Sequence, residues 1–233
     1  MTVSTAGRPA AFFDLDKTLI AVNSGKLWMN HEREEGRLPL SMVLRGMSYF
    51  LLYHFGLIDM NKAMSQALGT VKGISEERVD QITQEWFHSI VTPYEAPGAR
   101  GTLNGHRKAG HPLVLLTSSS PYESRCAQKF FDMDARLHSH YEVQDGVFTG
   151  RFVAPLCYGE GKVHYATEYA REHGIDLGQS YFYTDSYTDL PVLELVGHPR
   201  IVAPDPRLRR LATRRGWPIL DWSAETKEGE VLL

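Results

Sequence analysis

The stretch that decides the fold is residues 10–18, which read AAFFDLDKT. Its first four residues are apolar and follow a proline, a pattern that predicts a short strand buried on both faces. Asp14 ends this strand, and Asp16 stands two positions later. Side chains at positions i and i+2 of an extended segment lie on one side, where two carboxylates repel each other unless a cation or a shared proton relieves them. The stretch therefore predicts a buried strand that leads into an acidic site.

Further apolar runs predict more strands, at residues 112–117, 180–184, 200–203 and 218–220. Helical patterns separate most of these runs, at residues 97–109, 121–131, 161–172 and 206–215. Strands that alternate with helices indicate an α/β fold, in which a Rossmann-like parallel sheet is sandwiched by helices. Ligands of such sheets bind beyond the carboxyl ends of the strands. Because Asp14, Thr117 and Asp185 each end a predicted strand, we expect them at one edge of the sheet.

The segment from residue 23 to residue 92 interrupts this alternation, because it contains helical patterns and no convincing strand. Its helices are expected at residues 25–35, 40–55, 61–68 and 75–90. We therefore predict an all-helical cap domain at residues 23–92, inserted into a core domain of residues 1–22 and 93–233. The cap would follow directly after the strand that carries Asp14, a position that suits a cover over an active site.

Other patterns predict structure or surface contacts rather than chemistry. Residues 142–149 carry an Asp-Gly turn between two short runs and predict a β-hairpin. His138 and His140 are expected on a surface strand, and the arginines of residues 206–215 on a solvated helix face, with contact to an anionic surface as the alternative. The apolar residues 40–55 are expected to fill the cap interior, or else to line an apolar pocket or meet a bilayer or a second subunit. Arg45 and Gly46 interrupt the run, which argues against a membrane span.

Composition and charge restrict the class of protein. The 233 residues include 25 Lys and Arg against 28 Asp and Glu, a formal charge of −3, which gives no reason to expect a nucleic-acid partner. Residues 1–8 lack the basic start and apolar core of a signal peptide. Cys126 and Cys157 lack metal-type spacing, which favours reduced thiols and a cytoplasmic location. The oligomeric state, monomer or homodimer, stays open.

A second site, for binding an anion, is expected at the residues that follow Thr117 in the sequence. Ser120 and Glu123 fit a capping box, and Pro121 fits the first position of a helix. The free N–H groups of this helix start, near Ser118, would form an anion pocket lined by hydroxyls. Taken alone, the same pattern also fits a serine-rich loop with an ordinary helix cap.

Two further sites follow along the chain. Lys162 comes after Gly-Glu-Gly at the start of a helix, where it could reach a phosphate oxygen or an acidic nucleophile, or simply be a solvated charge. Asp185 and Asp189 follow a buried strand, where Asp185 could also serve as a helix cap. Hard oxygen ligands without a nearby set of His and Cys indicate Mg²⁺ as the metal.

Together the four sites resemble the haloacid dehalogenase superfamily of phosphatases. The first motif of that superfamily, DxDxT, matches residues 14–18, and its second, a Thr or Ser that ends a strand, matches Thr117. The third, a Lys that opens a helix, matches Lys162, and the fourth, an acidic pair, matches Asp185 and Asp189. The motifs cover nearly the whole chain in the family order. The helical insert resembles the cap of the phosphoserine-phosphatase-like branch.

The resemblance implies the catalytic roles. Asp14 would attack phosphorus and form an aspartyl-phosphate. Asp16 would protonate the leaving oxygen and then deprotonate the hydrolytic water. Mg²⁺ would be held by Asp14, the backbone carbonyl of Asp16, and Asp185, while Asp189 would support its water shell or Lys162.

The resemblance also implies how a small-molecule phosphomonoester is bound. Lys162 and Thr117, with N–H groups near Ser118, would hold the phosphate oxygens, and Thr18 would orient the Asp14 loop. Phosphoserine phosphatases carry a Glu nine positions after the nucleophile, where it pairs with the substrate ammonium. That position is Asn23 here, so phosphoserine is not expected to be the preferred substrate.

Other functions could use the same motif residues. A phosphotransferase or mutase of this fold also uses paired aspartates. Dehalogenases of the superfamily lack the second Asp, whereas Asp16 is present here. A non-catalytic binding module would have no need for all of the acidic and basic motif residues.

Overall fold

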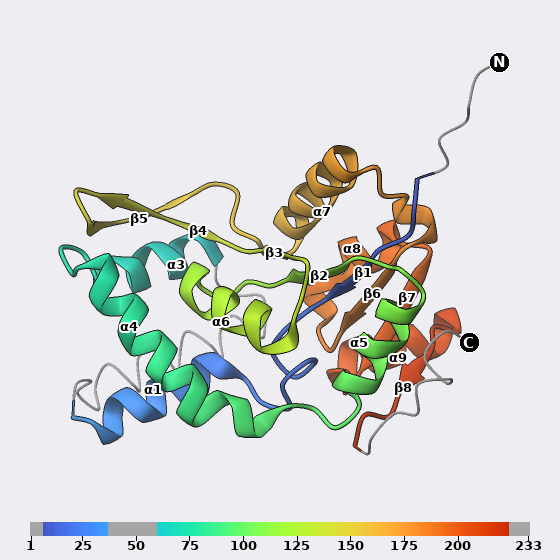
Figure 1. Cartoon of the computed structure of the whole chain (residues 1–233), viewed down its shortest axis with the longest axis horizontal. Helices are drawn as coiled ribbons and strands as arrows, with labels where there is room; N and C mark the ends of the chain where they lie inside the picture. Colours follow the sequence, from blue (N-terminus) through green and yellow to red (C-terminus); the bar gives the residue numbers. More distant parts are fainter. Residues whose placement is uncertain (1–6, 37–59, 224–233) are drawn as a thin grey trace.

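The computed structural model describes residues 7–36 and 60–223 (Figure 1). These residues form a six-stranded parallel sheet in the order β3-β2-β1-β6-β7-β8, and all five pairings between neighbours are parallel. The strands are β1 (Ala11–Phe13), β2 (Leu113–Leu116), β3 (Ala135–Leu137), β6 (Tyr181–Thr184), β7 (His198–Val202) and β8 (Ile219–Leu220). The predicted α/β fold with a parallel sheet is confirmed.

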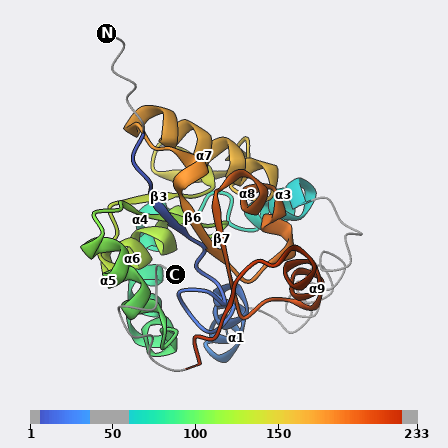
Figure 2. The same cartoon turned by 90° about the vertical axis from the view of Figure 1, so that its right-hand side faces the viewer.

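Helices cover both faces of the sheet (Figure 2). They are α5 (Ala99–Lys108), α6 (Pro121–Phe131), α7 (Glu160–His173), α8 (Leu190–Leu195) and α9 (Pro206–Arg215). Phe13 packs in one apolar cluster with residues of α5 and α6, whereas its neighbour Phe12 packs in a second cluster with residues of α7, α8 and α9. Both phenylalanines are fully buried, which contributes about 1.5–3 kcal/mol each. The alternation along β1 therefore produces the three layers.

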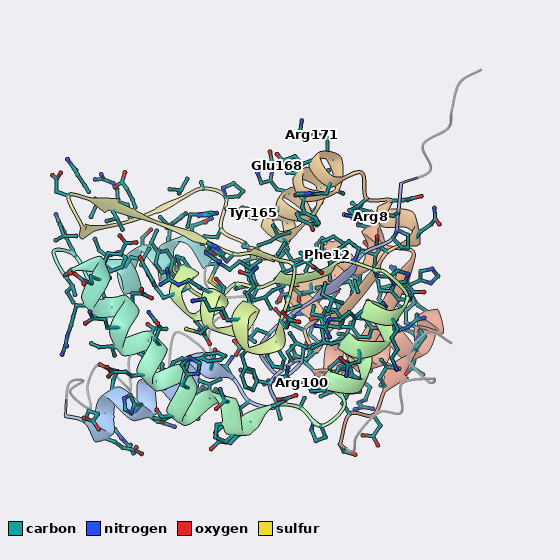
Figure 3. The ribbon with its side chains drawn as sticks, viewed as in Figure 1. Arg8, Phe12, Arg100, Tyr165, Glu168 and Arg171 are labelled. Carbon is teal, nitrogen blue, oxygen red and sulfur yellow. The ribbon has the colours of Figure 1, made fainter. Side chains whose placement is uncertain are left out.

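The amphipathic helix α7 illustrates how one outer layer is attached. Ala166 and Ala170 face the cluster that contains Phe12. Glu168 and Arg171 lie on the opposite, exposed face, at the outer surface of the molecule (Figure 3). Tyr169, on the same buried face, packs edge-on against Phe12 of β1, so the helix meets the sheet through small residues and one aromatic ring.

The described elements that follow β1, as far as α5, are helices joined by loops. They include α1 (Ser24–Glu34), α3 (Met60–Gly69) and α4 (Glu76–Trp86), followed by a π-helical turn at Phe87–Val91 and a 3₁₀ turn at Thr92–Tyr94. These match the helices predicted near residues 25–35, 61–68 and 75–90. The predicted apolar helix at residues 40–55 lies outside the described residues.

The predicted hairpin is present as β4 (His140–Gln144) and β5 (Val147–Val153). Asp145 and Gly146 both have positive φ angles, of 51° and 75°, as a two-residue type I′ turn requires. The buried Phe148 of β5 packs edge-on against Tyr122 of α6, and β5 contacts α3. The hairpin therefore joins the helices between β1 and β2 to the sheet domain.

One surface expectation is wrong. His138 lies between β3 and β4, is 7% exposed and places Nδ1 2.9 Å from the carbonyl oxygen of Ser139. Burial lowers the pKa of His138 to about 4, so the ring is neutral at pH 7. His140 is exposed as expected.

A bilayer-crossing helix would have to be both long and strongly apolar, and none of the helices within residues 7–36 and 60–223 meets that description.

Candidate active site

The ends of three neighbouring parallel strands bring predicted site residues to one edge. β1 lies between β2 and β6, so Asp14, Thr117 and Asp185, which directly follow these strands, stand side by side. The backbone N–H of Asp14 donates to the carbonyl oxygen of Tyr183 at 2.9 Å, which extends the pairing of β1 and β6 to Asp14. All three side chains are buried.

A charged cluster lies at the centre of this edge, and we call Asp14, Lys162, Thr184 and Asp189 the Lys162 cluster. Nζ of Lys162 donates to Oδ1 of Asp14 and to Oδ2 of Asp189, both at 2.8 Å. The hydroxyl of Thr184 donates to the same Oδ2 of Asp189 at 2.6 Å. Lys162 is only 2% exposed, so these partners replace its water. Removing one partner of such a buried pair typically costs about 3–5 kcal/mol.

The glycines before Lys162 explain how the helix start reaches the cluster. A Cβ atom on Gly161 would lie 1.7 Å from the carbonyl oxygen of Leu156, which only a glycine avoids. Gly159 has a φ of +52°, a conformation that L residues rarely adopt. The sequence Gly-Glu-Gly-Lys is therefore needed to bring the first turn of α7 against the Leu156 loop, with Lys162 directed at Asp14.

Electrostatics keep Lys162 charged. Burial alone would lower the pKa of Lys162, but the charges of Asp14 and Asp189 outweigh burial, so its pKa is raised. For Asp14, the effect of burial on the pKa outweighs the effect of the neighbouring positive charge. Burial raises the pKa of Asp14 to about 7, against the opposing charge of Lys162. One lysine between two carboxylates does not fully stabilise the ionised form of both.

A second carboxylate at this edge meets the same shortage of positive charge. Burial, reinforced by the charge of Asp14, raises the pKa of Asp185 to about 8. Its nearest cation is the half-exposed Lys17, whose Nζ lies 3.8 Å from Oδ2. Two desolvated carboxylates whose charge is only partly compensated by Lys162 and Lys17 fit a hard divalent cation such as Mg²⁺.

The number of protein ligands is compatible with that ion. Within the described ranges, no group of three or more His, Cys, Asp or Glu side chains is arranged to hold a metal. Asp14 and Asp185 would hold a Mg²⁺ ion that keeps several of its waters.

Asp16 lies in the loop after β1, and its carboxylate contacts the first residue of α1. Its Oδ1 accepts from the N–H of Ser24 at 2.7 Å, and its Oδ2 lies 3.5 Å from Nδ2 of Asn23. Desolvation raises the pKa of Asp16, although the bond from Ser24 opposes the shift. Asn23 is the N-cap of α1, because its side chain accepts from the N–H of Lys26 at 3.0 Å. Both functional groups of the Asn23 side chain therefore face protein atoms.

The predicted anion pocket follows β2. The hydroxyl of Thr117 accepts from the N–H of Ser119 at 3.1 Å, and Ser118 between them is half-buried. The N-cap of α6 is Ser120, whose hydroxyl accepts from the N–H of Glu123 at 3.1 Å. Thr18 is fully buried, and its hydroxyl has no hydrogen-bond partner in the part of the chain that the structure describes.

Two residues of the site were not singled out by the sequence. Thr184 precedes Asp185 and could have been identified from the hydroxyl that ends β6. Glu123 was assigned only to the capping box, yet its side chain is 8% exposed, and its Oε1 finds no partner among the described atoms. Burial raises the pKa of Glu123 to about 8, and the nearby charge of Asp16 adds to the shift.

Comparison with known proteins agrees with this geometry. Residues 11–194 match the family model of the haloacid dehalogenase-like hydrolases. A probable phosphatase of Mycobacterium tuberculosis is 36% identical over 93% of this chain and 76% of its own length. A phosphoserine phosphatase of the same organism is 31% identical, over 95% and 73%. A histidinol-phosphatase of Neisseria meningitidis is 27% identical, over 91% and 98%.

A solved structure has nearly the same fold. The crystal structure of a protein of unknown function from Bordetella pertussis superimposes with a TM-score of 0.85 at 29% identity, over 93% of this chain and 99% of that one. The chain therefore belongs to the haloacid dehalogenase-like hydrolase family, as a phosphatase of its phosphoserine-phosphatase-like branch.

Proposed function

We propose that this phosphatase hydrolyses small phosphomonoesters with Mg²⁺, through an aspartyl-phosphate on Asp14. The observation that carries the proposal is the Lys162 cluster. Lys162 fixes Oδ1 of Asp14 at the edge of the sheet and supplies a buried positive charge beside it. A fixed carboxylate next to a desolvated cation is suited to attack an anionic phosphate, whose charge Lys162 offsets.

In the first step, an oxygen of Asp14 attacks phosphorus, and the bond from phosphorus to the alcohol oxygen breaks. Asp16 donates its proton to the departing oxygen. Its raised pKa allows it to carry that proton, and Ser24 holds its other oxygen in place. In the second step, water attacks the aspartyl-phosphate, Asp16 takes up the water proton, and inorganic phosphate leaves.

Further residues hold the phosphate and the ion. Lys162, Thr117 and the N–H groups near Ser118 receive the phosphate oxygens, and Thr18 orients the loop of Asp14. Asp14, the carbonyl of Asp16, and Asp185 would hold Mg²⁺, which would neutralise charge on the phosphate and the carboxylates. Asp189 supports this arrangement by holding Lys162.

The helical segment at residues 23–92 is proposed to act as the cap. Its position between β1 and β2 supports this, because α1 begins directly beside Asp16. A cap in contact with the acid–base residue can select the leaving group.

Phosphoserine is proposed not to be the preferred substrate, although one relative is named a phosphoserine phosphatase. The position nine residues after Asp14 is the neutral Asn23, which caps α1. A buried ammonium without a carboxylate there loses about 2–5 kcal/mol. A panel of phosphomonoesters tests this proposal, and phosphoserine as the best substrate would overturn it.

The mechanism is tested by incubating the protein with a ³²P-labelled ester as substrate, quenching the reaction with acid, and measuring the label that stays on the protein. Wild-type protein should carry acid-stable label. Asp14→Asn should carry no label, and its activity should be lower by at least about 10³-fold. Asp145→Asn, in the exposed hairpin turn where Asn is also favoured, is the matched control. Turnover by Asp14→Asn above a few per cent would refute the nucleophile.

A phosphotransferase on the same residues would form the same intermediate. Adding a sugar or alcohol to the assay distinguishes the two, because a transferase moves label to the added hydroxyl, whereas a hydrolase releases phosphate.

A further inference from the structure

A buried carboxyl group beside the proposed acid–base residue has no cation. Glu123 is the third residue of α6, and its Oε1 is enclosed without a hydrogen-bond partner among residues 7–36 and 60–223. A buried polar atom that lacks a partner destabilises the protein, and more so when the group is charged. A bound ligand with a hydrogen-bond donor would satisfy this oxygen, which the described residues leave without a donor.

The surroundings place this carboxyl group on the leaving-group side. The hydroxyls of Ser24 and Ser119 donate toward it. The backbone N–H of Ser24 holds Asp16, and that of Ser119 holds the hydroxyl of Thr117. Glu123 therefore lies between the proposed proton donor and the proposed phosphate site.

The charge around Glu123 is negative. Asp16 is close enough to raise the pKa of Glu123, and Tyr141 also faces it. Within the described part of the chain, no Lys or Arg is among the groups that shift this pKa. Other buried carboxylates of the site differ, since Asp14 has Lys162 and Asp185 has Lys17. The described residues thus supply no cation for the carboxyl group of Glu123.

We propose that Glu123 is a specificity-determining residue that receives the ammonium, or protonated ring nitrogen, of the departing alcohol. This inference rests on the proposed function, which places the leaving group at Asp16. A charge-assisted hydrogen bond to the ligand satisfies Oε1 and offsets the two carboxylates. A carboxylate on the same alcohol would add a third negative charge, so phosphomonoesters of amino alcohols fit better than those of amino acids.

The test uses two phosphonates of equal size as competitive inhibitors of p-nitrophenyl phosphate hydrolysis. 3-Aminopropylphosphonate carries an ammonium where butylphosphonate carries a methyl group. Wild-type protein should bind the amine at least about tenfold more tightly, and Glu123→Gln should reduce this ratio to about one. Glu77→Gln, exposed in the first turn of α4, should keep the wild-type ratio.

Equal inhibition of the wild-type protein by both phosphonates would overturn the inference, whether or not the variant folds. An unchanged ratio in folded Glu123→Gln would also overturn it. Failure of the proposed function is seen separately, as p-nitrophenyl phosphate hydrolysis that survives Asp14→Asn.

Discussion

Two charged regions of the molecule, the Lys162 cluster and the arginine face of α9, differ in how their charges are solvated. The Lys162 cluster is buried, and each charge in it has a partner at 2.6–2.8 Å. The arginine face of α9 surrounds an open cavity of about 650 Å³, lined by Tyr187, Arg207, Arg209, Arg210, Thr213 and Arg214. None of its four arginines forms an ion pair with an acidic side chain that the structure describes.

The two regions are joined by Asp205. Its N–H donates to the carbonyl oxygen of Asp185 at 2.9 Å, and its carboxylate accepts from the N–H of Tyr187 at 2.6 Å. The arginine face has four cationic side chains, whereas the Lys162 cluster has one. Buried charges, however, are retained only where partners offset the loss of water, and their field is stronger there. Paired burial therefore distinguishes the Lys162 cluster, the proposed catalytic region, from the arginine face.

The largest expected effect comes from removing the central cation. Lys162→Met leaves Asp14 and Asp189 buried without it, so we expect a loss of about 3–5 kcal/mol of stability. Activity should fall by about 10²–10³-fold, as for other lost donors to transition-state charge. Urea unfolding and kcat/KM measure the two effects.

The matched control for Lys162→Met is Arg210→Met on the arginine face, which removes a charge that is already solvated. Its stability and activity should stay close to wild type. The double variant Lys162→Met with Asp189→Asn should regain part of the stability but not the activity. Recovery of activity would mean that Lys162 serves only to neutralise Asp189.

A smaller effect is expected from a hydroxyl within the cluster. Thr184→Val keeps the shape but removes the donor to Asp189, at a cost of about 1.5–3 kcal/mol because the acceptor is charged. Thr213→Val is the control, since its hydroxyl donates to the carbonyl of Arg209 at an exposed site of α9. Equal loss of stability in the two variants would contradict the importance of burial.

The contrast also shows how far sequence patterns reach. The apolar runs of β1, β2, β6 and β7 were predicted because continuous burial requires continuous apolar residues. β3 was missed because Ala135–Leu137 is half-buried and centred on an arginine. The six-residue helix α8 is too short to show a period.

Site residues that follow strand ends were predicted, because the topology of a parallel sheet fixes their edge. Glu123 was not, since its local pattern is satisfied by the cap between Ser120 and its own N–H. The partner of its side chain, Ser24, lies on another helix and about a hundred positions away. Local pattern carries no information on such a contact.

The dependence of metal binding on pH tests the acidic half of the site. In the metal-free protein, the pKa values of Asp14 and Asp185, about 7 and about 8, lie above the ordinary value of 3.8. Stability from their protonated forms is fully present below the ordinary value and is lost as the pH rises through 7 to 8. Protons also compete with Mg²⁺ for both groups.

We therefore expect Mg²⁺ to raise Tm by more at about pH 8.5 than at about pH 6, and Asp185→Asn to reduce this difference. Thermal unfolding with and without Mg²⁺ measures it. An equal rise at both pH values would mean that the ion binds elsewhere.

The smallest effect is expected on the arginine face itself. Arg207 stacks over the ring of Tyr187, with its guanidinium carbon 4.0 Å from the ring centroid, and such exposed contacts contribute about 0.5–1 kcal/mol. Arg207→Ala should thus lower stability by no more than this, and kcat/KM for p-nitrophenyl phosphate should change by less than about twofold. A larger loss of kcat/KM at unchanged stability would show that the cavity takes part in binding. In that case the solvated arginines would extend the phosphate site beyond the buried cluster, and the distinction between the two regions would fail.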